Sequence, residues 1–151
     1  MTLDTEVQSL GQIPMFRDID PSRLKLLAFT SERIHYRDGQ LFFAQGDAAD
    51  AAYVILEGCA EVVVENAGER VKVAELGRNA LVGEMGILSD APRSATVVAT
   101  EPVTALRIDK RVFLELLTQF PLMAIAIMRE LARRLERTNA QLVSRAAPKP
   151  V

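Results

Sequence analysis

Glycine is distributed unevenly along this chain, and its distribution restricts the fold more than any other sequence feature. Seven of the eight glycines lie between Gly39 and Gly86. They separate short runs rich in β-branched and aromatic residues, a pattern typical of short strands joined by tight turns. These runs cover residues 41–44, 52–56, 61–65, 70–76, 96–100 and 103–108. Six short strands must close on themselves to bury one face, so we expect an antiparallel roll or barrel.

The two ends of the chain carry helical patterns. A helix is expected to begin at Asp20-Pro21, a second at Asp109, and a third to run from Pro121 to about residue 143. The third has an apolar stripe with one polar member, formed by Met128, Leu131, Leu135, Thr138 and Leu142. We therefore expect a single domain over residues 1–151, with the roll at about 32–108, C-terminal helices at about 109–143 and a loose tail at 144–151.

Composition excludes several function classes. The 18 basic and 20 acidic side chains give a net charge of −2, which argues against binding nucleic acid by bulk charge. A single cysteine, Cys59, and a single histidine, His35, exclude a disulfide framework and a multi-histidine metal site. We therefore do not expect an enzyme. No apolar run has the ~20 residues of a membrane span, and the N-terminus lacks a signal-peptide pattern, so we expect a cytoplasmic protein without a membrane partner.

The segment from residue 82 to residue 96 does not have the pattern of another strand. Gly83 and Gly86 flank Glu84 in a short run that can form a helix, and Arg93 follows. Backbone N–H groups at the start of a helix can hold a phosphate, and glycine lets the backbone approach closely. Arginine binds an anion through planar paired donors, and a carboxylate accepts from a ribose hydroxyl. The segment therefore predicts a site for a small anion that carries a hydroxylated ring.

This segment resembles the phosphate-binding cassette of the cyclic nucleotide-binding domain family. That family includes the sensor domain of bacterial catabolite regulators, the regulatory subunits of cAMP-dependent kinase and cyclic-nucleotide-gated channels. The cassette matches are Gly83-Glu84-Met85-Gly86-Ile87 and Arg93-Ser94-Ala95-Thr96, and further matches at Ile13-Pro14-Met15-Phe16, Gly46-Asp47 and Leu56-Glu57-Gly58 extend the resemblance over nearly the whole chain. It implies a mainly β fold, a double-stranded β-helix or jelly-roll with N-terminal helices and a long C-terminal helix.

The resemblance also implies a role for each cassette residue. Glu84 would accept a hydrogen bond from the ribose 2′-hydroxyl, and Arg93 would pair with the cyclic phosphate. Ala95 would keep the pocket floor clear. Three backbone N–H groups would join Arg93, those of Gly86, Ile87 and Ser94. The full set of expected ligand-binding residues is Gly83, Glu84, Met85, Gly86, Ile87, Arg93, Ser94, Ala95 and Thr138.

The sequence says less about the nucleotide base and the signalling partner than about the phosphate and the ribose. Ser94 stands where family members that prefer cGMP often have threonine, and Thr138 matches a threonine that contacts adenine in the catabolite regulators. Both observations favour cAMP over cGMP as the ligand, with no other cofactor. The long helix also resembles the regulators' dimer helix, which suggests a homodimer or an unknown protein effector. The chain stops where those regulators begin a helix-turn-helix module, so we expect no DNA-binding module.

Several alternatives stay open at this point. Glu84 and Arg93 could form a surface ion pair beside a glycine turn, or the pocket could have lost its ligand. Thr138 could only set the register of a coiled coil, and the basic residues of the C-terminal helix could form a solvated face. At the level of the whole protein, the rivals are a ligand-free interaction module, a cupin-like enzyme and a domain excised from a longer protein.

Overall fold

The structure, a computed structural model, describes residues 3–13, 16–17 and 19–146, without the side chains of residues 3–5, 138 and 141–146. Within this part of the chain, eight strands form two antiparallel four-stranded sheets. The strands are β1 (Glu32–Tyr36), β2 (Leu41–Phe43), β3 (Ala51–Glu57), β4 (Ala60–Asn66), β5 (Glu69–Leu76), β6 (Leu81–Val82), β7 (Thr96–Ala99) and β8 (Val103–Asp109). The sheet orders are β1-β8-β3-β6 and β2-β7-β4-β5, which confirms the predicted antiparallel roll.

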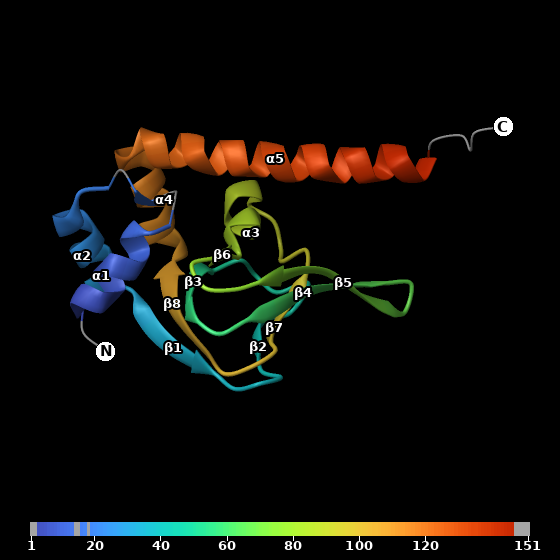
Figure 1. Ribbon diagram of the computed structural model, residues 1–151, viewed down its shortest axis with the longest axis horizontal. Coiled ribbons are helices and arrows are strands. Elements are labelled where there is room, and N and C mark those ends of the chain that lie inside the picture. The colour runs from blue at the N-terminus through green and yellow to red at the C-terminus, as the bar shows by residue number, and fades with distance from the viewer. Residues whose placement is uncertain (1–2, 14–15, 18, 147–151) are drawn as a thin grey trace.

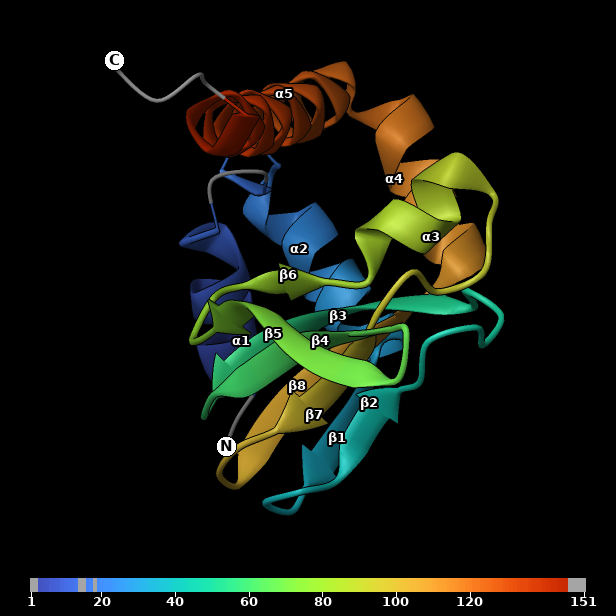
Figure 2. The same ribbon diagram turned by 90° about the vertical axis from the view of Figure 1, so that its right-hand side faces the viewer.

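The helices are gathered on one side of this roll (Figure 1). They are α1 (Leu3–Gly11), α2 (Pro21–Thr30), α3 (Glu84–Ser89), α4 (Lys110–Gln119) and α5 (Pro121–Ala146). In the turned view, α3 lies between α5 and the strands (Figure 2). Helix α5 ends at Ala146, three residues beyond the end that we expected, at about residue 143. Residues 147–151 lie outside the described part of the chain.

Strand β3 explains why the molecule has two apolar cores. Six of its seven residues are buried, since each of its faces packs against a different layer. Ala52, Val54 and Leu56 join the core between the sheet and the helices. The alternating residues Ala51, Tyr53 and Ile55 join the core between the two sheets. This central strand carries no free polar face, which accounts for its continuous run of apolar residues.

Helix α5 packs on the rest of the molecule only along its first part. Met123 and Ile127 are buried in the helix-side core, and Leu131 packs against it at the same spacing of four residues. Met128 and Leu135 are 59% and 61% exposed. Of the apolar stripe that we predicted, Leu131 therefore packs at the edge of the core, while its neighbours Met128 and Leu135 stay exposed. Past α3, α5 continues above the β4–β5 hairpin (Figure 1).

No single helix among the described residues has both the length and the hydropathy to cross a membrane. Helix α4 and the first part of α5 reach these values only together, across a bend of 108°.

Candidate functional site

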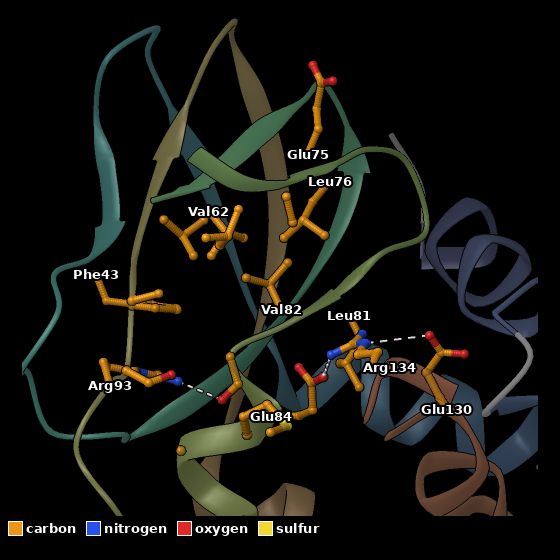
Figure 3. A pocket seen from close by; sticks show the side chains of 18 of the residues that line it. Phe43, Val62, Glu75, Leu76, Leu81, Val82, Glu84, Arg93, Glu130 and Arg134 are labelled. Carbon is orange, nitrogen blue, oxygen red and sulfur yellow. Dashed lines mark hydrogen bonds and ion pairs between the residues drawn. The ribbon is translucent and has the colours of Figure 1, made fainter. Parts of the chain in front are cut away.

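A cavity of about 540 Å³ lies between the cassette, the β4–β5 hairpin and α5. Its walls combine apolar strand residues with charged groups from the cassette and the helix (Figure 3). The cassette contributes Gly83, Glu84, Met85, Gly86, Arg93, Ser94 and Ala95, the strands contribute Phe43, Val62, Val73, Ala74, Glu75, Leu76, Leu81, Val82 and Val97, and α5 contributes Glu130, Arg134 and Arg137. This size falls within the range of small-molecule sites, about 300–1,000 Å³.

Glycine is required at two positions of the cassette. Gly83, the residue before α3, has a φ of +84°, and a Cβ placed there would lie 2.6 Å from the Nη1 atom of Arg93. Gly86 lies inside α3, and a Cβ placed there would lie 2.6 Å from the Cβ of Ala49. The first glycine permits the left-handed turn into the helix, and the second allows the helix to approach the chain that precedes β3.

Arg93 is buried, with 3% of its surface exposed, and its guanidinium binds backbone carbonyls. Its Nη1 atom donates to the Gly83 carbonyl at 2.6 Å and its Nη2 atom donates to the Ala51 carbonyl at 2.6 Å. The Oδ1 atom of Asp50 lies 3.6 Å from Nη2, and no described residue accepts from Nε. Burial lowers the pKa of Arg93 below its ordinary value. A buried guanidinium with a donor still unused is prepared to receive an anion.

Glu84 is equally buried and is held by α5. Arg134 donates from its Nη1 atom to the Oε1 atom of Glu84 at 2.8 Å, and its Nε atom lies 3.5 Å from Oε1 of Glu130 (Figure 3). The Glu84 side chain is 5% exposed and that of Arg134 is 40% exposed. Glu84 and Arg93 are therefore not a surface ion pair, since both are buried and each has other partners.

Glu130 sits among arginines at the helix side of the pocket. Burial alone would raise the pKa of Glu130. The hydrogen bond from Arg133 and the charges of Arg134, Arg133 and Arg137 act more strongly, so the pKa lies below its ordinary value. The carboxylate is thus ionised near neutral pH and keeps these side chains along one side of α5.

The predicted site residues fall into three groups. Seven of the nine line the cavity, namely Gly83, Glu84, Met85, Gly86, Arg93, Ser94 and Ala95. Ile87 has its side chain in the helix-side core instead, so only its backbone could serve a ligand. The Thr138 side chain lies outside the described residues, and its contact with a base stays a prediction.

Sequence reasoning missed Phe43, Arg134, Glu130 and Arg137. The three helix residues belong to the basic stretch that we interpreted as a solvated face. A helical period extended from Ile127 and Leu131 would have placed Arg134 toward the cassette. Nothing in the sequence near Phe43 marked that residue.

Comparison with known proteins identifies the family of this chain. A model of the "Cyclic nucleotide-binding domain" matches residues 33–120, more than half of the chain. The chain belongs to the cyclic nucleotide-binding domain family. It is 32% identical over 130 residues to the cyclic AMP receptor protein of Thermus thermophilus, an alignment that covers 85% of this chain and 60% of the relative. It is 33% identical over 108 residues to a cAMP-dependent protein kinase regulatory subunit of Mucor circinelloides, covering 72% and 25% respectively.

The solved structures agree with the fold. The Thermus thermophilus catabolite activator protein superposes with a TM-score of 0.77 at 32% identity, over 85% of this domain and 61% of that chain. The jelly-roll predicted from the cassette resemblance is thereby confirmed. The domain spans less than two thirds of these relatives, so it corresponds to one portion of each. The named relatives are a receptor protein and a regulatory subunit, and no group of three or more metal-ligating side chains occurs among the residues described for this domain.

Proposed function

We propose that this domain binds a 3′,5′-cyclic nucleotide, with cAMP preferred, in the cavity beside the cassette. One observation carries the proposal: the cavity brings a buried arginine and a buried glutamate, Arg93 and Glu84, to the same wall, each 3% exposed. A cyclic nucleotide presents an anionic phosphate next to a ribose hydroxyl, which these two groups complement. The family membership supports the same ligand class.

The phosphate end of the ligand belongs at Arg93. Its Nε atom has no partner among the described residues, and its Nη atoms bind neutral carbonyls that leave the positive charge uncancelled. The Oδ1 atom of Asp50, the nearest carboxylate oxygen at 3.6 Å, belongs to a side chain that is 65% exposed. An anion in the cavity would therefore form charge-assisted hydrogen bonds without displacing a buried acid.

The ribose end belongs at Glu84. A ribose 2′-hydroxyl that donates to this carboxylate shares it with, or takes it from, Arg134. Ligand binding and the position of α5 are then coupled, because the same carboxylate serves both. This coupling supports a regulatory role, in which a helix changes its packing when the nucleotide binds.

The preference for cAMP rests on Ser94 and Thr138. Replacing Thr138 by alanine should lower the affinity for cAMP more than the affinity for cGMP, because only the adenine amino group would lose a partner. Equal losses for the two nucleotides would reject the contact between Thr138 and the base. Parallel calorimetric titrations of the variant and the unchanged domain provide this comparison.

We further propose that α5 transmits the signal by pairing with a second copy of this chain. Met128 and Leu135 are exposed and seven residues apart, so they occupy equivalent positions of a heptad. An exposed apolar seam on a long helix is the arrangement that two-stranded coiled coils use. A ligand-free interaction module, which would use the same helix, is the second candidate.

Calorimetric titration of unfolded and refolded protein tests the proposed function. Refolding removes any nucleotide carried through purification, and cAMP and cGMP are then added separately. Arg93→Ala should weaken binding at least tenfold, since a charge-assisted hydrogen bond contributes roughly 1.5–3 kcal/mol. Arg111→Ala is the matched control, because the Arg111 side chain is 88% exposed on α4 and does not line the cavity. No heat with either nucleotide, from protein shown to be folded by circular dichroism, would favour the interaction module.

A further inference from the structure

The guanidinium of Arg93 lies over one aromatic ring, that of Phe43. Its central carbon is 3.9 Å from the centroid of the Phe43 ring, well inside the range of a cation–π interaction. Figure 3 shows the Phe43 ring directly beside the Arg93 side chain, at the wall of the cavity. The Phe43 ring also lies near Tyr53, whose ring centroid is 6.0 Å away.

This contact solves an electrostatic problem that hydrogen bonds alone leave open. Arg93 is buried, and burial lowers its pKa, because a charge is costly to keep away from water. The Asp50 carboxylate lies 3.6 Å from Nη2, and a carboxylate in closer contact would stabilise the charge further but would also occupy the donors that a phosphate needs. The π face of Phe43 attracts the cation without accepting any N–H bond. The donors at the edge of the guanidinium stay available.

Backbone atoms around Arg93 define where the Phe43 ring packs against it. The Gly83 and Ala51 carbonyls hold the two Nη atoms, which fixes the plane of the guanidinium. A Cβ at Gly83 would lie 2.6 Å from Nη1 of Arg93 and 3.1 Å from Cε2 of Phe43. The glycine, the arginine and the ring therefore pack in direct contact, and the ring covers the guanidinium plane that the carbonyls have oriented.

We propose that Phe43 is a positioning residue for the anion site: its ring holds the Arg93 guanidinium in the orientation that presents Nε and the remaining N–H donors to the cyclic phosphate. The inference rests on the proposed function and adds to it a residue outside the cassette. Phe43 acts through Arg93, so its replacement should weaken binding of the phosphate while the fold is kept.

Calorimetry with three variants at neighbouring positions tests this role. Phe43→Leu keeps an apolar side chain but removes the π face, and should weaken cAMP binding about 2- to 30-fold. Phe43→Tyr keeps the π face and should bind as the unchanged domain does. Phe42→Leu is the matched control, because Phe42 stacks on Tyr36 at 4.2 Å and does not line the cavity. Equal losses in Phe43→Leu and Phe42→Leu, or no rescue by tyrosine, would overturn the proposal.

A second measurement works without any ligand. The Arg93 Nε–H signal in a ¹H–¹⁵N spectrum, assigned by its loss in Arg93→Lys, should lie upfield because of the ring current of Phe43. It should move downfield in Phe43→Leu and stay in Phe42→Leu. If the unchanged domain bound no cyclic nucleotide, the proposed function would be refuted, and this signal alone would decide whether Phe43 orients Arg93. A signal that stayed in place in Phe43→Leu would overturn the inference.

Discussion

Arg134 of α5 donates a hydrogen bond of 2.8 Å to the buried carboxylate of Glu84, fifty residues earlier in the sequence at the start of α3. The pair joins the C-terminal helix directly to the cassette. Glu84 is thus the one acid that serves the proposed ribose contact and also anchors the helix. Any ligand that changes the hydrogen bonds of Glu84 changes what holds α5 in place.

Removing the arginine should therefore destabilise the ligand-free domain. In Arg134→Met the Glu84 carboxylate keeps its burial but loses a charged donor, and we expect unfolding free energy to fall by about 1–3 kcal/mol. Urea denaturation followed by circular dichroism measures the change. Arg133→Met is the control on the same helix, because the Arg133 side chain is 62% exposed and pairs only with Glu130 among the ion pairs of the described residues. Equal effects of the two substitutions would contradict a specific anchor at Glu84.

Two glycines with nearly the same positive φ allow the cost of backbone strain to be separated from the cost of a steric clash. Gly83 and Gly68 have φ values of +84° and +82°, but an added Cβ at Gly68 meets nothing within 4 Å. Gly68→Ala should cost only the backbone strain, about 1–2 kcal/mol. Gly83→Ala should cost about 3 kcal/mol and lose nucleotide binding, because its Cβ displaces Arg93. Denaturation and titration of both variants check this, and nucleotide binding by Gly83→Ala as tight as that of the unchanged domain would be contrary to the account.

The lowered pKa of Glu130 predicts that the free energy of unfolding depends on pH in the acidic range. Glu130 has an ordinary value of 4.5 and a lower one when folded, so its ion pairs contribute fully above pH 4.5 and are lost as pH falls through the folded value. Glu130→Gln should therefore be less stable than the unchanged domain at pH 7. The difference should shrink toward zero as the pH falls below 4.5. Thermal melts of both proteins between pH 7 and pH 3 measure it, and a difference that stays constant would reject the assignment.

The proposed dimer can be tested at the exposed seam of α5, formed by Met128 and Leu135. Leu135→Glu places a charge in the seam and should weaken association at least tenfold, because burying one leucine contributes roughly 1.5–3 kcal/mol. Leu26→Glu is the control, since Leu26 on α2 is 60% exposed and Leu135 is 61% exposed. Sedimentation equilibrium compares the two variants with the unchanged chain. A monomer in all three proteins would reject pairing through α5.

The sequence predicted those parts of the fold that depend on neighbouring residues. Glycine turns and β-branched runs located six of the strands, and a contiguous motif located the cassette. Strand β6 was missed because its two residues, Leu81 and Val82, are held only by pairing with β3. Strand β1, at the sheet edge, has three polar residues among its five, Glu32, Arg33 and His35, and lacks a strong apolar signal.

The candidate site was predictable only on its cassette side. Glu84 and Arg93 fall within one motif of adjacent segments, so their proximity could be expected from sequence. Arg134 and Phe43 reach them from elements about forty to fifty residues away in sequence. Their places depend on how α5 and β2 pack against the roll, which no local pattern specifies.

Binding of a cyclic nucleotide beside the cassette is tested most directly by a ¹H–¹⁵N spectrum of the refolded domain titrated with cAMP. We expect the largest shifts on the backbone amides of Gly83, Glu84, Gly86, Ser94 and Ala95, and we expect the Arg134 amide to move as Glu84 changes partners. Saturating cAMP that leaves these amides unmoved, or that shifts only residues far from the cavity such as those of β1, would contradict binding at this site.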